Sequence, residues 1–206
     1  MTKKPTTTSY AVLGLLAVRP WTTYELAKQV QRSLNWFWPR AERKLYDEPK
    51  RLVEQGLATA VKEQTGRRAR TLNAITKDVR RAMRDWLSEP PVPPALEFEG
   101  MVKVFFAEAG TLQQLLDTLE RIEDNAMQRL RALSDLAATR PLPFPERGHL
   151  NAISLRLQFE QEDAVARWAR WARKQAEQWT ASDDPGSWRF EPVLDDLASS
   201  GQGAKH

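Results

Sequence analysis

The sequence predicts a mainly α-helical protein with one small β-hairpin, and two observations carry this expectation. Over most of the 206 residues, apolar side chains recur at spacings of three and four, as on one face of a helix. Only the stretch from Leu57 to Asn73 is typical of short antiparallel strands, with Thr65-Gly66-Arg67-Arg68 as the turn between them. We therefore expect an N-terminal unit of helices closed by a hairpin, followed by an all-helical region.

The first two helices have clear boundaries in the sequence. An apolar face runs through Thr7–Val18, and Arg19-Pro20 ends it. Thr22 is a good N-cap for the second helix. Glu25, three residues later, completes a capping box, in which the two side chains satisfy each other's backbone N–H groups. This second helix is expected to stop near Leu34-Asn35.

A third, basic helix should begin just after Pro39 and run to about Gln55. Leu45 and Leu52 face the core, and Gly56 is a natural C-terminal cap. Pro49 lies inside this helix, where a proline removes one backbone hydrogen bond, and so predicts a kink. The alternative is that the helix ends at Glu48 and restarts.

Helix, turn, basic helix and basic hairpin, in this order, form the plan of a winged helix-turn-helix. In such a unit one helix enters the DNA major groove and the hairpin loop, or wing, meets the backbone. The charge distribution agrees: residues 1–88 hold 18 basic and 8 acidic side chains, whereas the remainder holds 13 and 19. A basic N-terminal half is typical of nucleic-acid binding. The alternative is an ordinary solvated basic surface.

Proline-rich residues divide the chain. Glu89-Pro90-Pro91-Val92-Pro93-Pro94 cannot continue a helix and predicts a linker over 89–95. We expect a DNA-binding winged helix-turn-helix over 1–88 and a helical dimerisation domain over 96–180. The polar tail, 181–206, is expected to be partly disordered, with Trp188, Phe190, Val193 and Leu194 as its candidate anchoring residues.

Two long helices are predicted after the linker, beyond a first helical segment over 95–108. Thr111 and Gln114 form a second capping box, which opens a helix to about Thr139, and a last helix covers 149–179. Apolar residues in the first of these helices follow the alternating spacing of a coiled-coil seam. The expected dimerisation residues are Leu112, Leu116, Leu119, Leu130, Leu133, Leu157, Trp168 and Trp171.

Several short motifs in the first 80 residues resemble the PadR family of bacterial transcriptional regulators. They are Ala11-Val12-Leu13-Gly14-Leu15-Leu16, Tyr24-Glu25-Leu26, Phe37-Trp38-Pro39, Leu45-Tyr46, Lys50-Arg51-Leu52, Gly56-Leu57, Gly66-Arg67-Arg68-Ala69-Arg70-Thr71 and Ile75-Thr76. The resemblance implies a dimeric DNA-binding repressor. Leu72-Asn73, where the family often has tyrosine, and Ala41-Glu42-Arg43-Lys44 depart from the pattern, so the operator sequence cannot be carried over.

The expected DNA contacts fall in three groups. Arg43 and Lys44 lie in the first turns of the third helix, where arginine and lysine reach guanine, although Lys44 suits a phosphate equally well. Arg67, Arg68 and Arg70 suit the DNA backbone or minor groove from the wing. Contacts with the DNA backbone are expected of Thr22, Thr23, Tyr24, Arg40 and Lys50, and the resemblance implies one for Tyr46 as well. For Thr22 the capping role is an equal explanation, and for Tyr46 the alternative is packing against the second helix.

Other functional classes find little support. With no cysteine, the chain lacks disulfides and thiolate metal sites, and no metal or cofactor motif occurs. No Ser/His/Asp constellation is present, so an enzyme is the least supported class. No apolar run reaches the roughly 20 residues of a membrane span, and no signal peptide is recognisable. A cytoplasmic location follows as the simplest expectation.

The sequence thus predicts a dimeric transcriptional repressor that binds a palindromic DNA operator. Some PadR-family members bind planar aromatic compounds near tryptophans. This suggests Trp168 and Trp171 as an effector site, against the alternative that they only pack. Two further classes remain open. One is a winged helix used for protein interaction, and the other is a nonspecific architectural DNA binder.

Overall fold

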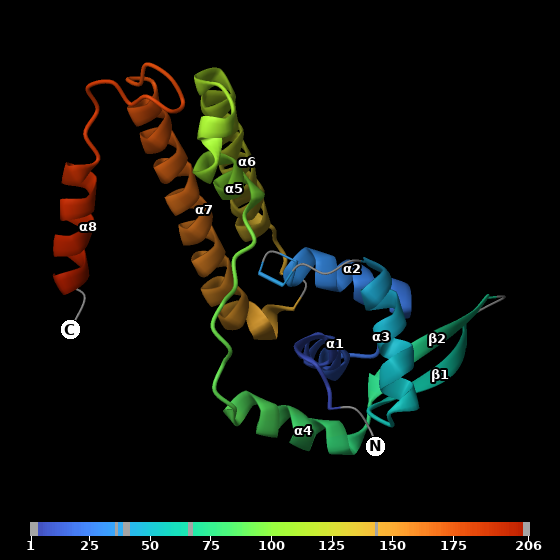
Figure 1. Ribbon diagram of the computed structural model, residues 1–206. Coiled ribbons are helices and arrows are strands. Elements are labelled where there is room, and N and C mark those ends of the chain that lie inside the picture. The colour runs from blue at the N-terminus through green and yellow to red at the C-terminus, as the bar shows by residue number, and fades with distance from the viewer. Residues whose placement is uncertain (1–3, 36, 39–41, 66–67, 143, 204–206) are drawn as a thin grey trace. The chain divides into compact units, whose positions relative to one another are not determined.

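The computed structural model describes residues 4–203 except 36, 39–41, 66–67 and 143; the side chains of residues 42–43, 63–65, 68–69, 77–78 and 201–203 also lie outside the description. The chain divides into two compact units, 1–94 and 95–206. Each unit is mainly helical, and the first carries a two-stranded antiparallel sheet (Figure 1). The predicted fold class, mainly α with a small β-hairpin, is confirmed.

Helix α1, Thr7–Val18, is the central element of the N-terminal unit and contacts α2, α3, α4 and β2. Val12, Leu13 and Leu16 are buried on it. Its N-cap is Thr6, which forms a capping box with Ser9. Helix α2, Thr23–Ser33, begins at the predicted box of Thr22 and Glu25. The first two helices therefore match the sequence prediction.

Helix α3, Glu42–Glu54, runs through Pro49 as a single helix, so the alternative of a break at Glu48 is wrong. Gly56 follows it at φ 71°, a left-handed conformation that glycine adopts without strain. The N–H of Leu57 donates to the carbonyl of Leu52 at 2.9 Å, and that of Gly56 donates to Val53 at 3.0 Å. These two bonds form the expected glycine cap.

The hairpin pairs β1, Ala58–Thr65, with β2, Arg68–Ile75, from Ala58 opposite Ile75 to Thr65 opposite Arg68. Helix α4, Lys77–Ser88, returns across α1, where Trp86 stacks on Tyr10 with 4.5 Å between ring centroids. Thr76 is its N-cap residue but makes no side-chain cap bond. Its hydroxyl instead donates to the Gly56 carbonyl at 3.4 Å.

The C-terminal unit is built on two long paired helices, α6, Leu112–Ala138, and α7, Gly148–Ala176 (Figure 1). The predicted capping box of Thr111 and Gln114 opens α6. In place of one helix over 95–108, a short α5, Glu99–Phe105, is followed by a 3-10 turn, Ala107–Ala109. A second 3-10 turn, Pro145–Arg147, leads into α7.

The buried face of α6 differs from the predicted seam in its N-terminal half. The buried side chains are Leu115, Leu119, Ile122, Ala126, Leu130 and Leu133. The predicted Leu112 and Leu116 are half-buried at the edge of this face. Leu115 and Leu116 both continue a three- and four-residue spacing, so spacing alone did not separate them.

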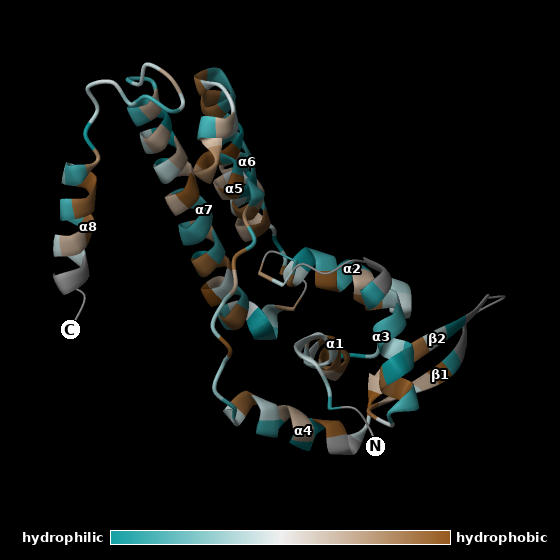
Figure 2. Cartoon of the chain, in the orientation of Figure 1, coloured by the Kyte–Doolittle hydropathy of each residue, from teal (hydrophilic) through white to brown (hydrophobic). Residues whose placement is uncertain are grey.

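The tail holds a helix, α8, Glu191–Gly203, where the sequence suggested a largely irregular segment. Val193, Leu194 and Leu197 repeat at helical spacing within it, which gives the helix one apolar side. Figure 2 shows this side as brown bands on α8. The segment before α8 is held by Trp188, whose indole N–H donates to Gln175 Oε1 at 3.0 Å.

Candidate nucleic-acid interface

The start of α2 is a tightly bonded corner. The Thr22 hydroxyl accepts from the N–H of Glu25 at 3.2 Å and donates to Glu25 Oε2 at 2.9 Å, while the N–H of Thr22 donates to the same carboxylate at 2.9 Å. These bonds with Thr22, aided by the charges of Arg19 and Arg70, lower the pKa of Glu25. The hydroxyl of Thr22 is thus occupied by its capping role, as the alternative for this residue states.

Tyr24, in the first turn of α2, is the most accessible of the residues expected there. Its side chain is 55% exposed, and the Lys28 ammonium lies 4.6 Å from the ring centroid. A cation held over an aromatic face keeps its charge while restricting the side chain. Lys28 therefore adds positive charge at this corner, which the sequence analysis did not assign.

Helix α3 separates an apolar side from a basic one. Leu45 and Leu52 are buried, whereas Lys44 and Lys50 are exposed. Tyr46 is half-buried and packs against the cluster of Ala27, Val30 and Leu45. Packing against the second helix, the alternative for Tyr46, is therefore observed. Arg40 and the side chain of Arg43 lie outside the described residues.

The wing is attached to the helices at its base. Trp21, between α1 and α2, pairs with Asn73 of β2 through two backbone hydrogen bonds, of 2.8 and 3.1 Å. The Asn73 amide, in a side chain that is almost fully buried, donates to the Trp21 carbonyl at 3.3 Å and to Thr23 Oγ1 at 3.4 Å. Sequence analysis had noted Asn73 only as a departure from the family pattern.

Of the predicted wing arginines, the structure describes the side chain of Arg70 alone. Arg70 is exposed on β2, in register opposite Glu63, and its charge acts on Glu25 of α2. Arg67 and the side chain of Arg68 fall outside the described part of the chain. The described wing and α2 are thus electrostatically linked at Arg70 and Glu25.

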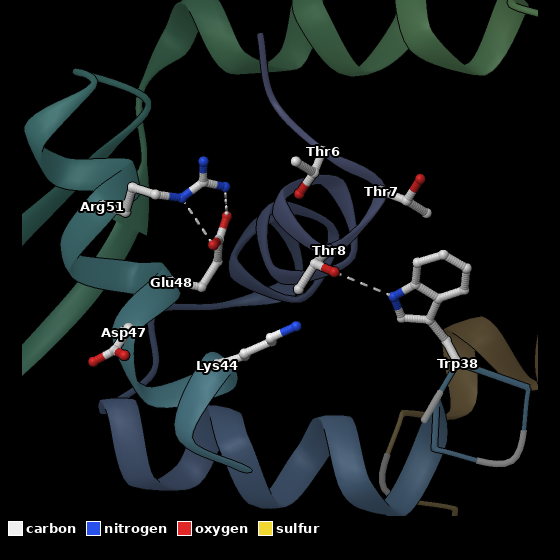
Figure 3. A pocket seen from close by; sticks show the side chains of 8 residues that line it. All are labelled: Thr6, Thr7, Thr8, Trp38, Lys44, Asp47, Glu48 and Arg51. Atoms are coloured by element: carbon white, nitrogen blue, oxygen red, sulfur yellow. Dashed lines mark hydrogen bonds and ion pairs between the residues drawn. The ribbon is translucent and has the colours of Figure 1, made fainter. Parts of the chain in front are cut away.

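A hollow of about 430 Å³ lies between α1 and α3 (Figure 3). Its lining residues are Thr6, Thr7, Thr8, Trp38, Lys44, Asp47, Glu48 and Arg51. The Trp38 indole N–H donates to Thr8 Oγ1 at 3.4 Å on one side. On the other side Arg51 forms an ion pair with Glu48. Lys44 extends into the space between these two sides in Figure 3, so this lysine borders both the hollow and the exposed side of α3.

The expected dimerisation residues separate into two sets. Leu119, Leu130 and Leu133 are buried inside the chain itself, and Leu112, Leu116 and Trp168 are half-buried. By contrast, Leu157 is 54% exposed and Trp171 43% exposed. The exposed set continues along α7 through Leu150 and Ile153, which were not in the predicted dimer seam. The first set thus stabilises the α6–α7 pair, and only the second is open to a partner.

Trp168 and Trp171, the suggested effector residues, do line a common cleft. Residues of α8 form its other wall: Pro192, Val193, Asp196 and Leu197. The cleft measures about 440 Å³. Among the described residues, no group of three or more His, Cys, Asp or Glu side chains could hold a metal ion. No helix in the described part of the chain is long and apolar enough to cross a membrane.

This fold and its basic α3 define a class of protein: a winged helix-turn-helix joined to a pair of helices. Residues 99–177 match the family model described as virulence activator alpha C-term. A negative transcriptional regulator, PadR of Bacillus subtilis (strain 168), is 26% identical over 163 residues, which cover 73% of this chain and 88% of that protein.

Solved structures agree with the sequence match. B. subtilis PadR in complex with operator DNA superposes with a TM-score of 0.70 at 22% identity, covering 82% of this chain and 98% of that one. PadR in complex with p-coumaric acid gives a TM-score of 0.64 at 23% identity, with the same coverage. The resemblance to PadR is confirmed: the chain is similar in sequence to B. subtilis PadR and shares its fold.

Proposed function

We propose that this protein is a cytoplasmic, homodimeric transcriptional repressor, without enzymatic activity, that binds a palindromic DNA operator. The observation that carries the proposal is the two-sided α3, with Leu45 and Leu52 buried and Lys44 and Lys50 presented to solvent. A helix of this kind, preceded by a capped α2 and followed by a wing, is built to enter a major groove. The relative from B. subtilis is a negative transcriptional regulator, which supports repression.

We assign the roles within residues 1–88 by position. Arg43 and Lys44, at the front of α3, read base edges. The wing and the first turn of α2 hold phosphates, since backbone amides and cations there suit anions. The residues given this second role are Thr23, Tyr24, Arg67, Arg68 and Arg70, together with Arg40 and Lys50 at and in α3. Thr22 and Tyr46 keep the capping and packing roles described above.

Residues 96–180 form the dimerisation domain in this proposal, joined to the DNA-binding unit by the linker 89–95. The exposed apolar stripe of α7, namely Leu150, Ile153, Leu157 and Trp171, provides a surface for a second copy. Large exposed apolar surface on a single chain is typical of an interface. A two-fold dimer then matches a palindromic operator whose half-sites lie about one turn of DNA apart.

A small aromatic effector is the second part of the proposal. Trp168 and Trp171 line the cleft, and one solved PadR complex contains p-coumaric acid. An effector changes DNA affinity only if it binds two states of the dimer differently. We expect release from DNA through a changed spacing of the two α3 helices.

The test is DNA binding by the full chain. Duplexes selected by the purified protein from a randomised library would be compared with random duplexes by fluorescence anisotropy at two salt concentrations. Selection of a shared palindromic sequence, bound far more tightly than random DNA, supports the proposal. Equal, strongly salt-dependent affinity for both DNAs would indicate an architectural role. No binding to either would favour a protein-interaction module.

The same assay tests the assignment of Arg43. Arg43→Ala is expected to lose about 1–3 kcal/mol on the selected duplex and far less on random DNA. Lys50→Ala, which removes a proposed phosphate contact, is the matched comparison, since it should weaken both DNAs alike. Equal losses on both duplexes for Arg43→Ala would show that this arginine reads no base.

A further inference from the structure

A chain of part-buried polar contacts joins α3 to the first turn of α1. Arg51 Nε donates to Glu48 Oε2 at 2.9 Å, and Arg51 Nη2 donates to the other carboxylate oxygen. The same Nη2 donates to Ser9 Oγ of α1 at 2.6 Å. Glu48 and Ser9 are both almost fully buried. One guanidinium, seen beside Glu48 in Figure 3, therefore binds the two helices together.

Ser9 is the junction of these contacts. Its hydroxyl accepts from the N–H of Thr6 at 2.8 Å as well as from Arg51, and it lies 3.0 Å from Thr6 Oγ1. A serine hydroxyl has two acceptor positions and one proton. Since Thr6 N–H and Arg51 fill both acceptor positions, its proton is directed to Thr6 Oγ1. Every hydrogen-bonding position of Ser9 is thus used, and the capping box of α1 is tied directly to α3.

Stability alone is a poor explanation for this arrangement. Burying a carboxylate such as that of Glu48 costs desolvation free energy, and apolar side chains of similar size often stabilise a core as well or better. What the guanidinium adds is direction, because its planar fork fixes the angle of each hydrogen bond. Rotation or sliding of α3 against α1 would break the contact with Ser9, whereas apolar packing would tolerate small shifts.

The position of the bridge along α3, formed by the bonds of Arg51 with Glu48 and Ser9, indicates what the fixed orientation does. Pro49 lies between Glu48 and Arg51, and a proline donates no backbone hydrogen bond within a helix. The missing bond is the one that residue 49 would donate to the Leu45 carbonyl, so the weakened turn lies between the Arg51–Glu48 pair and the front of α3. Lys44 stands two helical turns before Arg51, and Glu48 and Arg51 share the hollow with it. A change in the angle of α3 at the bridge would therefore move the front of the helix.

We propose that Ser9, Glu48 and Arg51 are positioning residues for DNA recognition. They fix the rotation of α3 against α1 and so set the discrimination between operator and random DNA, although Ser9 and Glu48 are too deeply buried to touch DNA. This inference rests on the proposed function and names residues that control it from inside the fold.

Two variants separate positioning from charge. Ser9→Ala removes the junction and leaves the Glu48–Arg51 pair in place. Arg51→Lys keeps the positive charge and removes the fork. Ser33→Ala is the matched control, because the Ser33 hydroxyl donates only to the Gln29 carbonyl within α2. The probes are a duplex selected by the wild-type protein from a randomised library and a random duplex of equal length.

The expected result is a five- to tenfold weaker affinity of Ser9→Ala and Arg51→Lys for the selected duplex, about the effect of one lost hydrogen bond of ordinary strength. Affinity for random DNA and its salt dependence should stay at the wild-type values, and Ser33→Ala should resemble the wild type throughout. Melting curves confirm that each variant is folded at the assay temperature. A purely structural role would lower the melting temperature and leave the ratio of the two affinities unchanged.

Three results would overturn the inference. An unchanged affinity ratio in folded Ser9→Ala would show that the junction does not set discrimination. A parallel loss on both duplexes with a smaller salt dependence would make Arg51 a phosphate contact. Absence of any sequence preference in the wild-type protein would refute the proposed function first and the inference with it. If Arg51→Lys does not fold, Ser9→Ala decides.

Discussion

Asn73 holds Trp21 with three hydrogen bonds, two from backbone to backbone and one from its side-chain amide to the Trp21 carbonyl. The contact fastens the base of the wing to the turn between α1 and α2. The wing and the start of α2 thereby share one support, so a change at either residue should affect both.

Asn73→Ala should lower the free energy of unfolding of the N-terminal unit by about 1–2 kcal/mol, because the buried Trp21 carbonyl and the Thr23 hydroxyl lose a donor. Urea denaturation of both proteins measures the difference. Asn151→Ala, at an exposed position on α7, is the control and should change little. A loss for Asn73→Ala no larger than that of the control would show that the amide contributes nothing.

We expect the contribution of Glu25 to the free energy of unfolding to depend on pH. Its pKa is lowered in the folded state by the bonds with Thr22, so it binds protons less readily than in the unfolded chain. Its contribution is therefore present above the unfolded pKa of about 4.3 and is lost as the pH falls through the lowered value. Glu25→Gln should be less stable near neutral pH by about 0.5–1 kcal/mol, with the difference vanishing in acid.

Unfolding curves of wild type and Glu25→Gln, collected between neutral and acid pH, test this expectation. The two curves of stability against pH should converge as the carboxylate of the wild type is protonated. A difference that stayed constant over the whole acid range would mean that the charge of Glu25 does not stabilise the corner.

We expect a substitution of Gln158 to stabilise the protein. This residue lies on α7 with 4% of its surface exposed, and its buried Oε1 accepts no hydrogen bond within the described residues. An unsatisfied buried oxygen costs free energy that an apolar side chain of similar length avoids. Gln158→Met should raise the free energy of unfolding by about 1 kcal/mol. Gln161→Met, at an exposed position, serves as the control, and a destabilised Gln158→Met would indicate a partner for the amide.

Trp188 should restrain the segment that precedes α8. Its indole N–H bonds Gln175, and its ring lies 5.5 Å from that of Trp179. Trp188→Ala should release the segment and speed trypsin cleavage at the exposed Arg189 about tenfold, since one hydrogen bond and one aromatic contact are lost. Leu194→Ala, exposed on α8, should leave the cleavage rate unchanged. Equal rates in the wild type and Trp188→Ala would place the restraint elsewhere.

Local patterns predicted most of the first unit. The α1 boundaries, the capping boxes at Thr22 and Thr111 and the glycine cap at Gly56 depend on residues a few positions apart, so the sequence displays them. The bond from Arg51 to Ser9 joins residues 42 positions apart, and no local sequence pattern predicts it. From the sequence, Arg51 was therefore named only within a family motif and given no role.

The C-terminal helices show a second limit. Spacing predicted that Leu119, Leu130 and Leu133 share a face, which the structure confirms, but spacing does not say what covers that face. The cover is α7 of the same chain. Similarly, the tail was expected to be irregular because its composition is polar, although its few apolar residues are placed at helical intervals.

In the ion pairs between α6 and α7, the helix that carries the acid changes partway along the two helices. Near one end the acids are on α6, with Glu123 bonded to Arg170 and Glu120 to Arg173. Further along the order is reversed, since Arg129 of α6 bonds Glu162 of α7. If α7 slid along α6 by about two turns, Arg129 would face Arg170, and like charges would replace opposite ones. The arrangement of charges on α6 and α7 thus disfavours this shifted alignment, whereas helices of uniform opposite charge would not distinguish it from the observed one.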